Sequence, residues 1–233
     1  VQAQCLEAGT VGNGYLAGQI STIVSPMAFL ASAVNTSESS GGSEEEADSS
    51  YAERLRLRPN SFSVAGPEKA YIFHTLSVSP AIIDVAIDSP TPGVVNVYTL
   101  LTGGELPKAA FLTEVENYLA SEEVRPLTDE VHALAPTAYS YSVNVDYYVL
   151  NSDAVKLDSI KTAVQAAVND YVSWQQSKIG RDINPDELIK RVRDAGAGRV
   201  VHSTLTPVFK TLTKSEVAQC SSVTVTFKGL EDG

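Results

Sequence analysis

Apolar side chains recur at helical spacing in five stretches of the chain. The clearest is at residues 108–121, where every third or fourth residue is apolar, which predicts an amphipathic helix. A longer helix is predicted at 153–177, with its apolar face running from Ile160 to Val172. Shorter helices are predicted at 48–58, 67–76 and 184–196, the last one capped by Asn184 with Pro185 as its first residue.

Strands are predicted where β-branched and aromatic residues alternate with polar ones between turn residues. These stretches are 82–88, 94–101, 131–134, 139–150, 200–205 and 223–227. Residues 1–35 follow neither spacing. They are small and apolar, and the closely spaced Gly9, Gly12, Gly14 and Gly18 favour tight turns between short extended segments.

The order of these elements predicts the fold class α+β. An extended, glycine-rich segment (1–35) precedes an acidic hinge and helix (36–64), and two tandem small α/β sandwich domains follow at 65–136 and 137–233. The tripeptide Val-Asn-Val begins a strand before a helix in both domains, at 95–97 and 143–145, which weakly favours a duplication. The chain begins with Val1 in mid-pattern, so we expect an N-terminal segment to be missing and residues 1–35 to end a larger extended region.

The helix predicted at 48–58 is sorted by charge along its axis. Acidic residues at 44–48 precede or open it, where the helix macrodipole is positive, and arginines lie near its other end. Ser50 and Glu53 have the spacing of a capping box, and Pro59 is expected to end the helix. Its apolar stripe, Tyr51 and Leu55, is thin, which predicts packing on one side only.

Composition limits the possible functions. The net charge of −11 disfavours nucleic acid as a main partner, because an acidic surface repels phosphate backbones. No apolar run reaches the ~20 residues that span a bilayer, so no membrane partner is expected. The two cysteines, Cys5 and Cys220, lie at opposite ends of the chain, so we expect neither a disulfide nor a Cys/His metal site.

One motif raises the question of an enzyme. Residues 12–17 match the dinucleotide fingerprint G-x-G-x-x-A, which requires a strand before it and a helix after it. Ser21, Thr22 and Pro26 disfavour that helix, so a plain glycine turn is the better interpretation. The three histidines are far apart, and no nucleophile–base pair is visible, so we expect no catalytic residue, cofactor, metal or small-molecule substrate. Trp174 is expected to pack at the edge of the core, with an interface anchor as the alternative.

The motifs, in their order, resemble the baseplate J-like family of contractile phage tails and related contractile injection systems. The resemblance covers nearly the whole chain, and its order and spacing are more specific than any single motif. The matching motifs are Gly9-x-x-Gly12-Asn13 with Ala17-Gly18-x-Ile20; Gly41-Gly42 with the acidic run to Asp48 and Arg54-x-Arg56; Gly66, Tyr71, Ile83-Asp84-Val85 and Pro92-Gly93-Val94-Val95; Arg125-Pro126-Leu127-Thr128 with Val131 and Pro136; and Gly180-x-x-Ile183 with Leu188, Val200 and Pro207.

The resemblance implies a structural protein of the virion. Members of this family are wedge components of the tail baseplate that dimerise and link wedges around the central hub. It implies no enzyme activity. The expected partners are a second copy of the chain and other wedge or hub proteins, and the expected location is the tail baseplate, assembled in the bacterial host cytoplasm. The alternatives are a nucleotide-binding enzyme that uses the glycine-rich segment and a generic adaptor module.

The charge-sorted helix offers candidate residues for contact between subunits. Two copies laid antiparallel would pair acidic residues with arginines twice, as a two-fold contact allows. The candidates are Glu44, Glu45, Glu46, Arg54 and Arg56. The competing interpretation is a solvated helix whose charges pair internally, and the sequence favours neither of the two.

Overall fold

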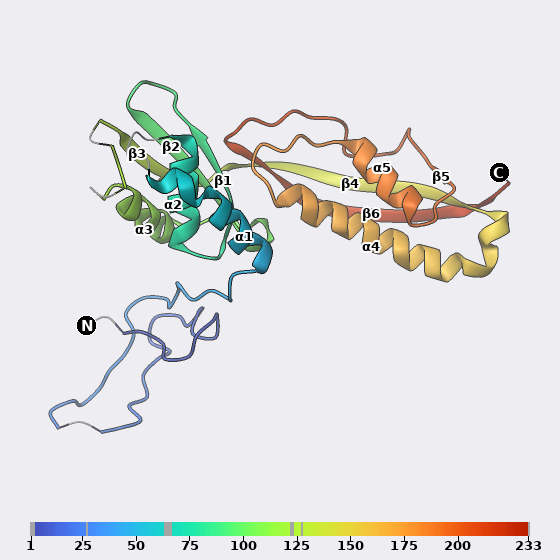
Figure 1. Cartoon of the computed structure of the whole chain (residues 1–233). Helices are drawn as coiled ribbons and strands as arrows, with labels where there is room; N and C mark the ends of the chain where they lie inside the picture. The colour runs from blue at the N-terminus through green and yellow to red at the C-terminus, as the bar shows by residue number, and fades with distance from the viewer. Residues whose placement is uncertain (1–2, 27, 63–66, 122–123, 127, 233) are drawn as a thin grey trace.

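The computed structural model describes residues 3–26, 28–62, 67–121, 124–126 and 128–232. The elements in chain order are α1 (Asp48–Leu57), η1 (Arg58–Phe62), α2 (Glu68–Val78), β1 (Ile82–Asp88), β2 (Val94–Leu101), η2 (Thr102–Gly104), α3 (Ala109–Leu119), β3 (Glu130–Leu134), β4 (Thr137–Leu150), η3 (Asn151–Lys156), α4 (Leu157–Gln176), α5 (Pro185–Asp194), β5 (Arg199–Val200) and β6 (Glu216–Glu231). The fold is α+β, as the sequence predicts. Figure 1 shows a rounded middle part (67–136), an elongated C-terminal part (137–232) and an N-terminal segment (3–26 and 28–47) that lies apart from both.

The middle part is one sheet of three strands in the order β1-β2-β3. β1 and β2 are antiparallel, whereas β2 and β3 are parallel and α3 crosses between them. Alternate residues of β2 are buried on the face that α2 and α3 cover, where Val95 and Val97 pack against Val115 and Leu119. This cluster is the core of the middle part.

The C-terminal part repeats that arrangement at larger scale. Its sheet has the order β5-β4-β6, with β4 antiparallel to β5 and parallel to β6. Each central strand, β2 and β4, carries one of the two Val-Asn-Val tripeptides. The odd-numbered residues of β4 from Tyr141 to Val149 are buried beneath α4, which places Val164, Val168 and Tyr171 against them. The expected domain boundaries at 35, 64 and 136 stay predictions.

Two strand predictions were wrong in extent. β5 is only Arg199–Val200, because the polar stretch His202–Thr204 turns out into solvent before Thr206 returns to bridge Asn144. β6 is 16 residues long instead of the five predicted at 223–227. Its additional residues pair with β4 but include exposed serines, so hydrophobic alternation does not mark them.

The bounds of α1 agree with the prediction to within one residue, but its N-terminal cap does not. Ala47 occupies the N-cap position and makes no side-chain hydrogen bond there, so Ser50 is already inside the helix and forms no capping box with Glu53. At the other end the α-helix ends at Leu57, before Pro59 as expected, and the chain continues as the 3₁₀ turn η1. A proline is tolerated in the first turn of such a segment, because its nitrogen needs no partner there.

The cap predicted for α5 is confirmed. The Asn184 side-chain oxygen accepts a hydrogen bond from the Asp186 N–H at 2.9 Å, and Pro185 follows as the first helical residue. We expect Asn184→Ala to lower the free energy of unfolding by about 1 kcal/mol, because one N–H at the helix start loses its partner. Denaturant unfolding measures the change. Asn169→Ala, on the exposed face of α4, is the control and should stay within about 0.5 kcal/mol of the parent.

Candidate assembly surfaces

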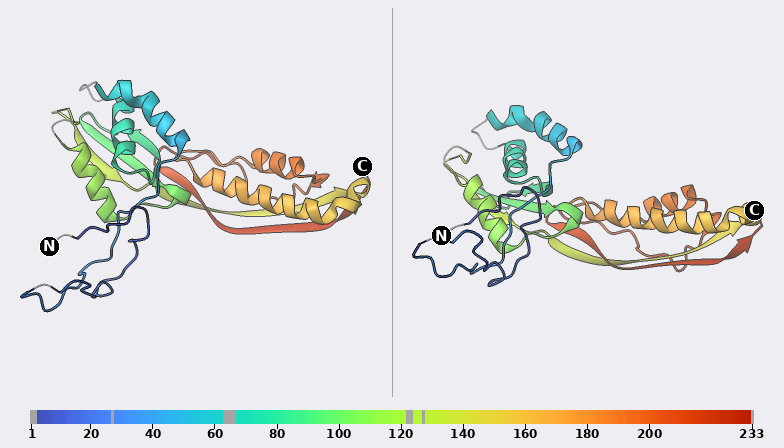
Figure 2. Two further views of the ribbon diagram at one scale, coloured as in Figure 1. Left: turned by 60° about the horizontal axis from the view of Figure 1, so that its bottom comes forward. Right: turned by 90° about the horizontal axis from the view of Figure 1, so that it is seen from below.

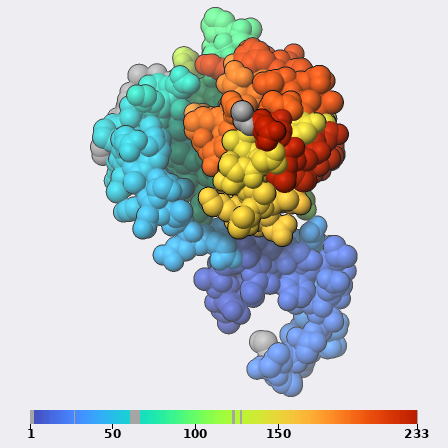
Figure 3. All heavy atoms as spheres, turned by 90° about the vertical axis from the view of Figure 1, so that its right-hand side faces the viewer, coloured from blue at the N-terminus to red at the C-terminus, as the bar shows by residue number. Residues whose placement is uncertain are grey.

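The N-terminal segment is a ribbon held by backbone hydrogen bonds across its two arms. Gly14 and Tyr15 pair with Ser39, and Gly18 and Ile20 pair with Asn35. Few apolar groups are buried in it. Its exposed apolar residues are Leu6, Val11, Tyr15, Leu16, Ile20, Val24, Phe29, Leu30 and Val34. In Figure 3 the ribbon, in blue, lies below the body formed by the other two parts.

Two motifs of the resemblance meet at the base of this ribbon. Asn13 donates to the Gly42 carbonyl at 2.7 Å, and its side-chain oxygen accepts from the Gly42 N–H at 2.9 Å. A side chain at position 42 would overlap the carbonyl oxygen of Gly9. The glycines therefore allow the two arms to approach closely. Among the residues described between 9 and 42 there is no strand or helix, so the dinucleotide fingerprint lacks the context that it needs.

The acidic run that precedes α1 is divided between internal partners and solvent. Glu44 accepts hydrogen bonds from the Thr10 hydroxyl at 2.5 Å and the Thr10 N–H at 3.3 Å, and these bonds lower the pKa of its carboxyl. Glu46 forms a two-pronged ion pair with Arg54, with nitrogen–oxygen distances of 3.1 and 2.7 Å. Hydrogen bonding from Arg54 lowers the pKa of Glu46. Glu45 lies exposed between them.

The arginines of α1 also have partners within the chain. The Arg54 guanidinium lies over the Tyr51 ring at 5.4 Å, and its side chain is 29% exposed. Arg56 pairs with Glu53 at 2.5 Å and is 74% exposed. Four of the five candidate contact residues therefore have a neighbour of their own, and the intersubunit contact stays a prediction. A second copy can reach the exposed ones, Glu45 and Arg56, without breaking the Glu46–Arg54 pair.

Sequence reasoning missed a junction that joins the middle and C-terminal parts. A small apolar cluster spans it, in which Leu100, Ile179 and Val217 are buried. Leu100 lies on the face of β2 opposite α2 and α3, so this strand is buried on both sides. The one visible signal was Asp84, a carboxylate among the apolar residues 82–87, which accepts the Ile179 N–H at 2.8 Å.

Two further contacts close the junction. Gln219 on β6 donates to the Gly104 carbonyl at 2.6 Å. Gly104 has φ = +78°, and a Cβ there would lie 2.9 Å from the Gln176 Cβ at the end of α4. Only glycine therefore fits this approach of η2 to α4 without a shift of the backbone.

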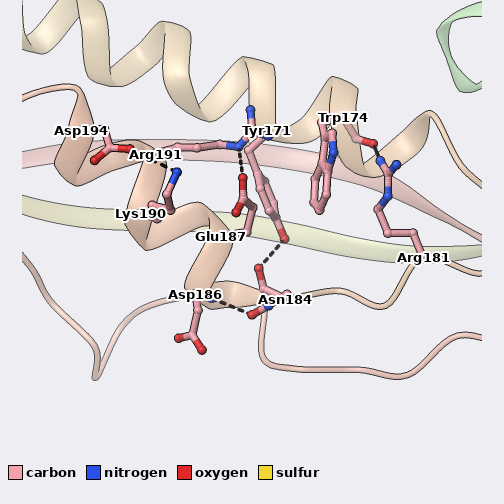
Figure 4. A network of polar contacts seen from close by, with 9 residues as sticks. All are labelled: Tyr171, Trp174, Arg181, Asn184, Asp186, Glu187, Lys190, Arg191 and Asp194. Atoms are coloured by element: carbon pink, nitrogen blue, oxygen red, sulfur yellow. Dashed lines mark hydrogen bonds and ion pairs between the residues drawn. The ribbon is translucent and has the colours of Figure 1, made fainter.

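Trp174 lies on the surface of the C-terminal core between two arginines. Figure 4 shows its ring flanked by Arg181 and Arg191, with ring-centroid distances of 4.1 and 5.2 Å. Arg191 also pairs with Glu187 at 2.8 Å, and Arg181 donates to the Trp174 carbonyl. The half-buried ring packs against the core cluster, as expected, and the two cations cover the rest of it.

Nothing in the described ranges gathers three His, Cys, Asp or Glu side chains closely enough to hold a metal ion. The histidines stay apart: His74 lies between the rings of Phe73 and Tyr118, His132 faces Glu130, and His202 is exposed. A hollow on the middle part is lined by Glu68, Asp88, Asp129 and Lys214, among others, and is open to solvent. Its Asp129 accepts the Tyr71 hydroxyl at 2.7 Å.

Three domain models of one family match the chain in succession. They are the baseplate J-like protein barrel domain at residues 1–42, the baseplate J-like central domain at 63–135 and the baseplate J-like protein C-terminal domain at 143–226. The chain belongs to the baseplate J-like family. The central-domain match covers nearly all of the middle part, and the C-terminal match begins within β4 and ends within β6.

One known protein supports this assignment, and a second shares the fold. Baseplate protein J of Escherichia phage P2 is 27% identical over 156 residues, which cover 66% of this chain and 51% of that protein. The chain thus spans about half the length of this curated relative. A chain of the anti-feeding prophage baseplate, known from a cryo-EM structure, shares the fold with a TM-score of 0.53 at 16% identity, covering 94% of this chain and 51% of its own length. None of the helices described in this baseplate J-like chain is long and apolar enough to cross a membrane.

The junction carboxylate gives a prediction on stability. Burial raises the pKa of Asp84, although the Ile179 N–H and nearby cations oppose this. Asp84→Ala leaves that N–H without a partner and should lower the free energy of unfolding by about 1–3 kcal/mol. Asp84→Asn keeps an acceptor oxygen and carries no charge to desolvate, so it should cost much less.

The same pair of variants has a pH signature. The folded state holds the Asp84 proton to a higher pH than the unfolded state does, so stability should decline as pH rises from the ordinary aspartate pKa through the raised value. Denaturant unfolding of the parent and Asp84→Asn across that acidic range measures this. The stability of the parent should fall relative to the variant as pH rises, and a constant difference would contradict the raised pKa.

Proposed function

We propose that this chain is a structural component of a contractile tail baseplate. Its relative in phage P2 is named baseplate protein J. The observation that carries the proposal is the succession of three family domains, in order, across most of the chain. The expected location is the virion tail, or the equivalent part of a contractile injection system, after assembly in the bacterial host cytoplasm.

The finer proposal is that the chain acts as a wedge protein, which dimerises and links neighbouring wedges around the hub. The elongated C-terminal part and the exposed N-terminal ribbon give it surfaces at both ends for contacts with other chains (Figure 1). A catalytic role has less support, because among the described residues no three potential metal ligands gather, the histidines lie apart and the hollow at Asp129 is open to solvent. We therefore propose a non-enzymatic role.

The direct test locates the protein on particles from its own phage or injection system. An affinity tag at the C-terminus of the full-length protein, detected by immunogold electron microscopy, should label the baseplate end of the tail. Deletion of the gene should yield particles without an assembled baseplate, and the tagged gene should restore them. Label spread along the sheath, or normal baseplates after deletion, would refute the proposal.

The charge-sorted helix gives a separate prediction on self-association. Arg54→Glu with Arg56→Glu should weaken self-association measured by light scattering, because acidic residues would then face acidic residues across a two-fold contact. Replacing Glu44, Glu45 and Glu46 together by Arg should weaken it in the same way. Each variant also loses an internal pair, so circular dichroism must show that both fold.

Mixing the two variants distinguishes a contact between subunits from a loss within one chain. At the substituted positions the acidic variant and the basic variant are complementary in both halves of the contact, so the mixture should associate although neither variant does so alone. Internal pairing within each chain predicts no such rescue. Absence of rescue would remove α1 from the interface and leave the baseplate proposal intact.

A further inference from the structure

The outer edge of β6 has no partner strand. β6 pairs with β4 along its whole length, and no other strand among those described pairs with its opposite edge. Figure 2 (left) shows β6, in red, along the lower border of the C-terminal part, with β4 and α4 above it. A 16-residue edge is long, since strands commonly have five or six residues. Its outward N–H and C=O groups are available to a further strand.

This edge has few of the features that prevent strand pairing. Between Glu216 and Glu231 the only charged residue is Lys228, and there is no proline. The pairing with β4 shifts register at two points, which leave Ser221 and Lys228 as the extra residues of two bulges. Bulges interrupt an edge, so the regular stretch available for pairing is the six-residue segment Ser222–Phe227 between them.

The side chains of that segment divide cleanly between the two faces of the sheet. Val225 and Phe227 lie at the rim of the core beneath α4, and Val223, on the same face, is 39% exposed. Lys161 of α4 lies over the Phe227 ring at 4.6 Å. Thr224 and Thr226 lie on the opposite, polar face. The edge therefore has an apolar rim on one side and hydroxyl groups on the other.

The sequence of the segment is self-complementary about Val225. In an antiparallel pair with a second copy centred there, Val225 faces its own counterpart and Val223 faces Phe227. On the other face Thr224 lies opposite Thr226. Aromatic–β-branched and Thr–Thr pairs are among the favourable cross-strand pairs. Lys228 falls opposite Ser222, so the pairing places no like charges opposite each other.

We propose that β6 pairs antiparallel with β6 of a second copy, about a two-fold axis at Val225. The two three-stranded sheets would then form one six-stranded sheet. This inference rests on the self-association proposed above and names a surface for it that is separate from α1.

Charge favours a second copy over an unrelated strand. Two chains of net charge −11 repel each other over most of their surfaces. The stretch from 217 to 230 contains no acidic residue, and its one lysine, Lys228, pairs with Asp146 at 3.4 Å, so it is a nearly neutral strip on an acidic molecule. Two copies can approach along it without placing carboxylates of 217–230 opposite each other, and the self-complementary order about Val225 suits a second copy.

Single cysteines test the register. In the full-length protein with Cys5→Ser and Cys220→Ala, Val225→Cys should form a disulfide-linked dimer under mild oxidation. Opposite residues of an antiparallel pair have Cα atoms ~4.5–5.5 Å apart, within the range of a disulfide. Val223→Cys is the matched control. Its counterpart would lie four residues away along the strand, ~13 Å, so it should not cross-link.

A second pair of variants tests the strength of the contact. Val223→Glu places a carboxylate against the partner's apolar rim and should raise the dimer dissociation constant at least about tenfold, measured by sedimentation over a concentration series. Val208→Glu makes the same substitution at a site that is 74% exposed and outside the strand, and it should leave the constant unchanged. Unfolding curves of both variants must match that of the parent.

Each outcome decides between named alternatives. If Val223→Glu leaves the dimer dissociation constant unchanged and Val225→Cys forms no cross-link, the β6 pairing is overturned. Self-association through another surface then stays open. A monomer at every concentration overturns self-association, while immunogold labelling at the baseplate would still support the structural role. Hydrogen exchange that slows in 222–227 only when another tail protein is added would overturn the second copy in favour of a different strand.

Discussion

The parallel pairing of β4 with β6 sets the arrangement of the whole C-terminal part. Parallel strands cannot be joined by a tight turn, so the chain must cross from one end of the sheet to the other before β6 can begin. α4 makes that crossing over the face where Val143, Val145 and Val149 are buried. α5 and the short β5 lie in the connection between α4 and β6. The 14 positions at which β6 pairs with β4 then fix the face of the sheet on which each of the paired β6 side chains lies.

The middle part uses the same arrangement with a shorter crossing, and the junction joins the two. Leu100 on β2 serves this contact, whereas its neighbours Val95 and Val97 serve the core under α2 and α3. Asp84 lies on the neighbouring strand β1, where a partly buried carboxylate at the junction needs a donor, and the Ile179 N–H supplies it. Gln219 adds a second bond across the boundary.

Local patterns predicted much of this fold. The extents of β1 and β2 follow from alternation between turn residues, and the cap of α5 follows from Asn184 and Pro185. β6 was underestimated, because its serines face solvent at an edge and interrupt the hydrophobic pattern while the backbone still pairs. The junction was missed, because Asp84, Gly104 and Ile179 are far apart in sequence and meet only once both sheets have formed.

The candidate contact residues illustrate the same limit. Sequence reasoning identified Glu46 and Arg54 as complementary charges, but spacing alone cannot say whether such charges pair within one chain or between two. The structure places Glu46 before the helix and Arg54 within it, close enough for a direct pair. Glu45 is exposed, and Arg56 stays exposed although it pairs with Glu53, so both are open to contact with another chain.

Gly104 has a mechanical consequence. Because Gly104 has no side chain, η2 lies directly against Gln176 at the end of α4, and the C-terminal part is a lever arm clamped at its inner end. The 20 residues of α4 span ~30 Å, so a tilt of ~5° at the clamp displaces the far end of the helix by ~3 Å. A bulkier residue at position 104 would push η2 away from Gln176 and loosen the clamp.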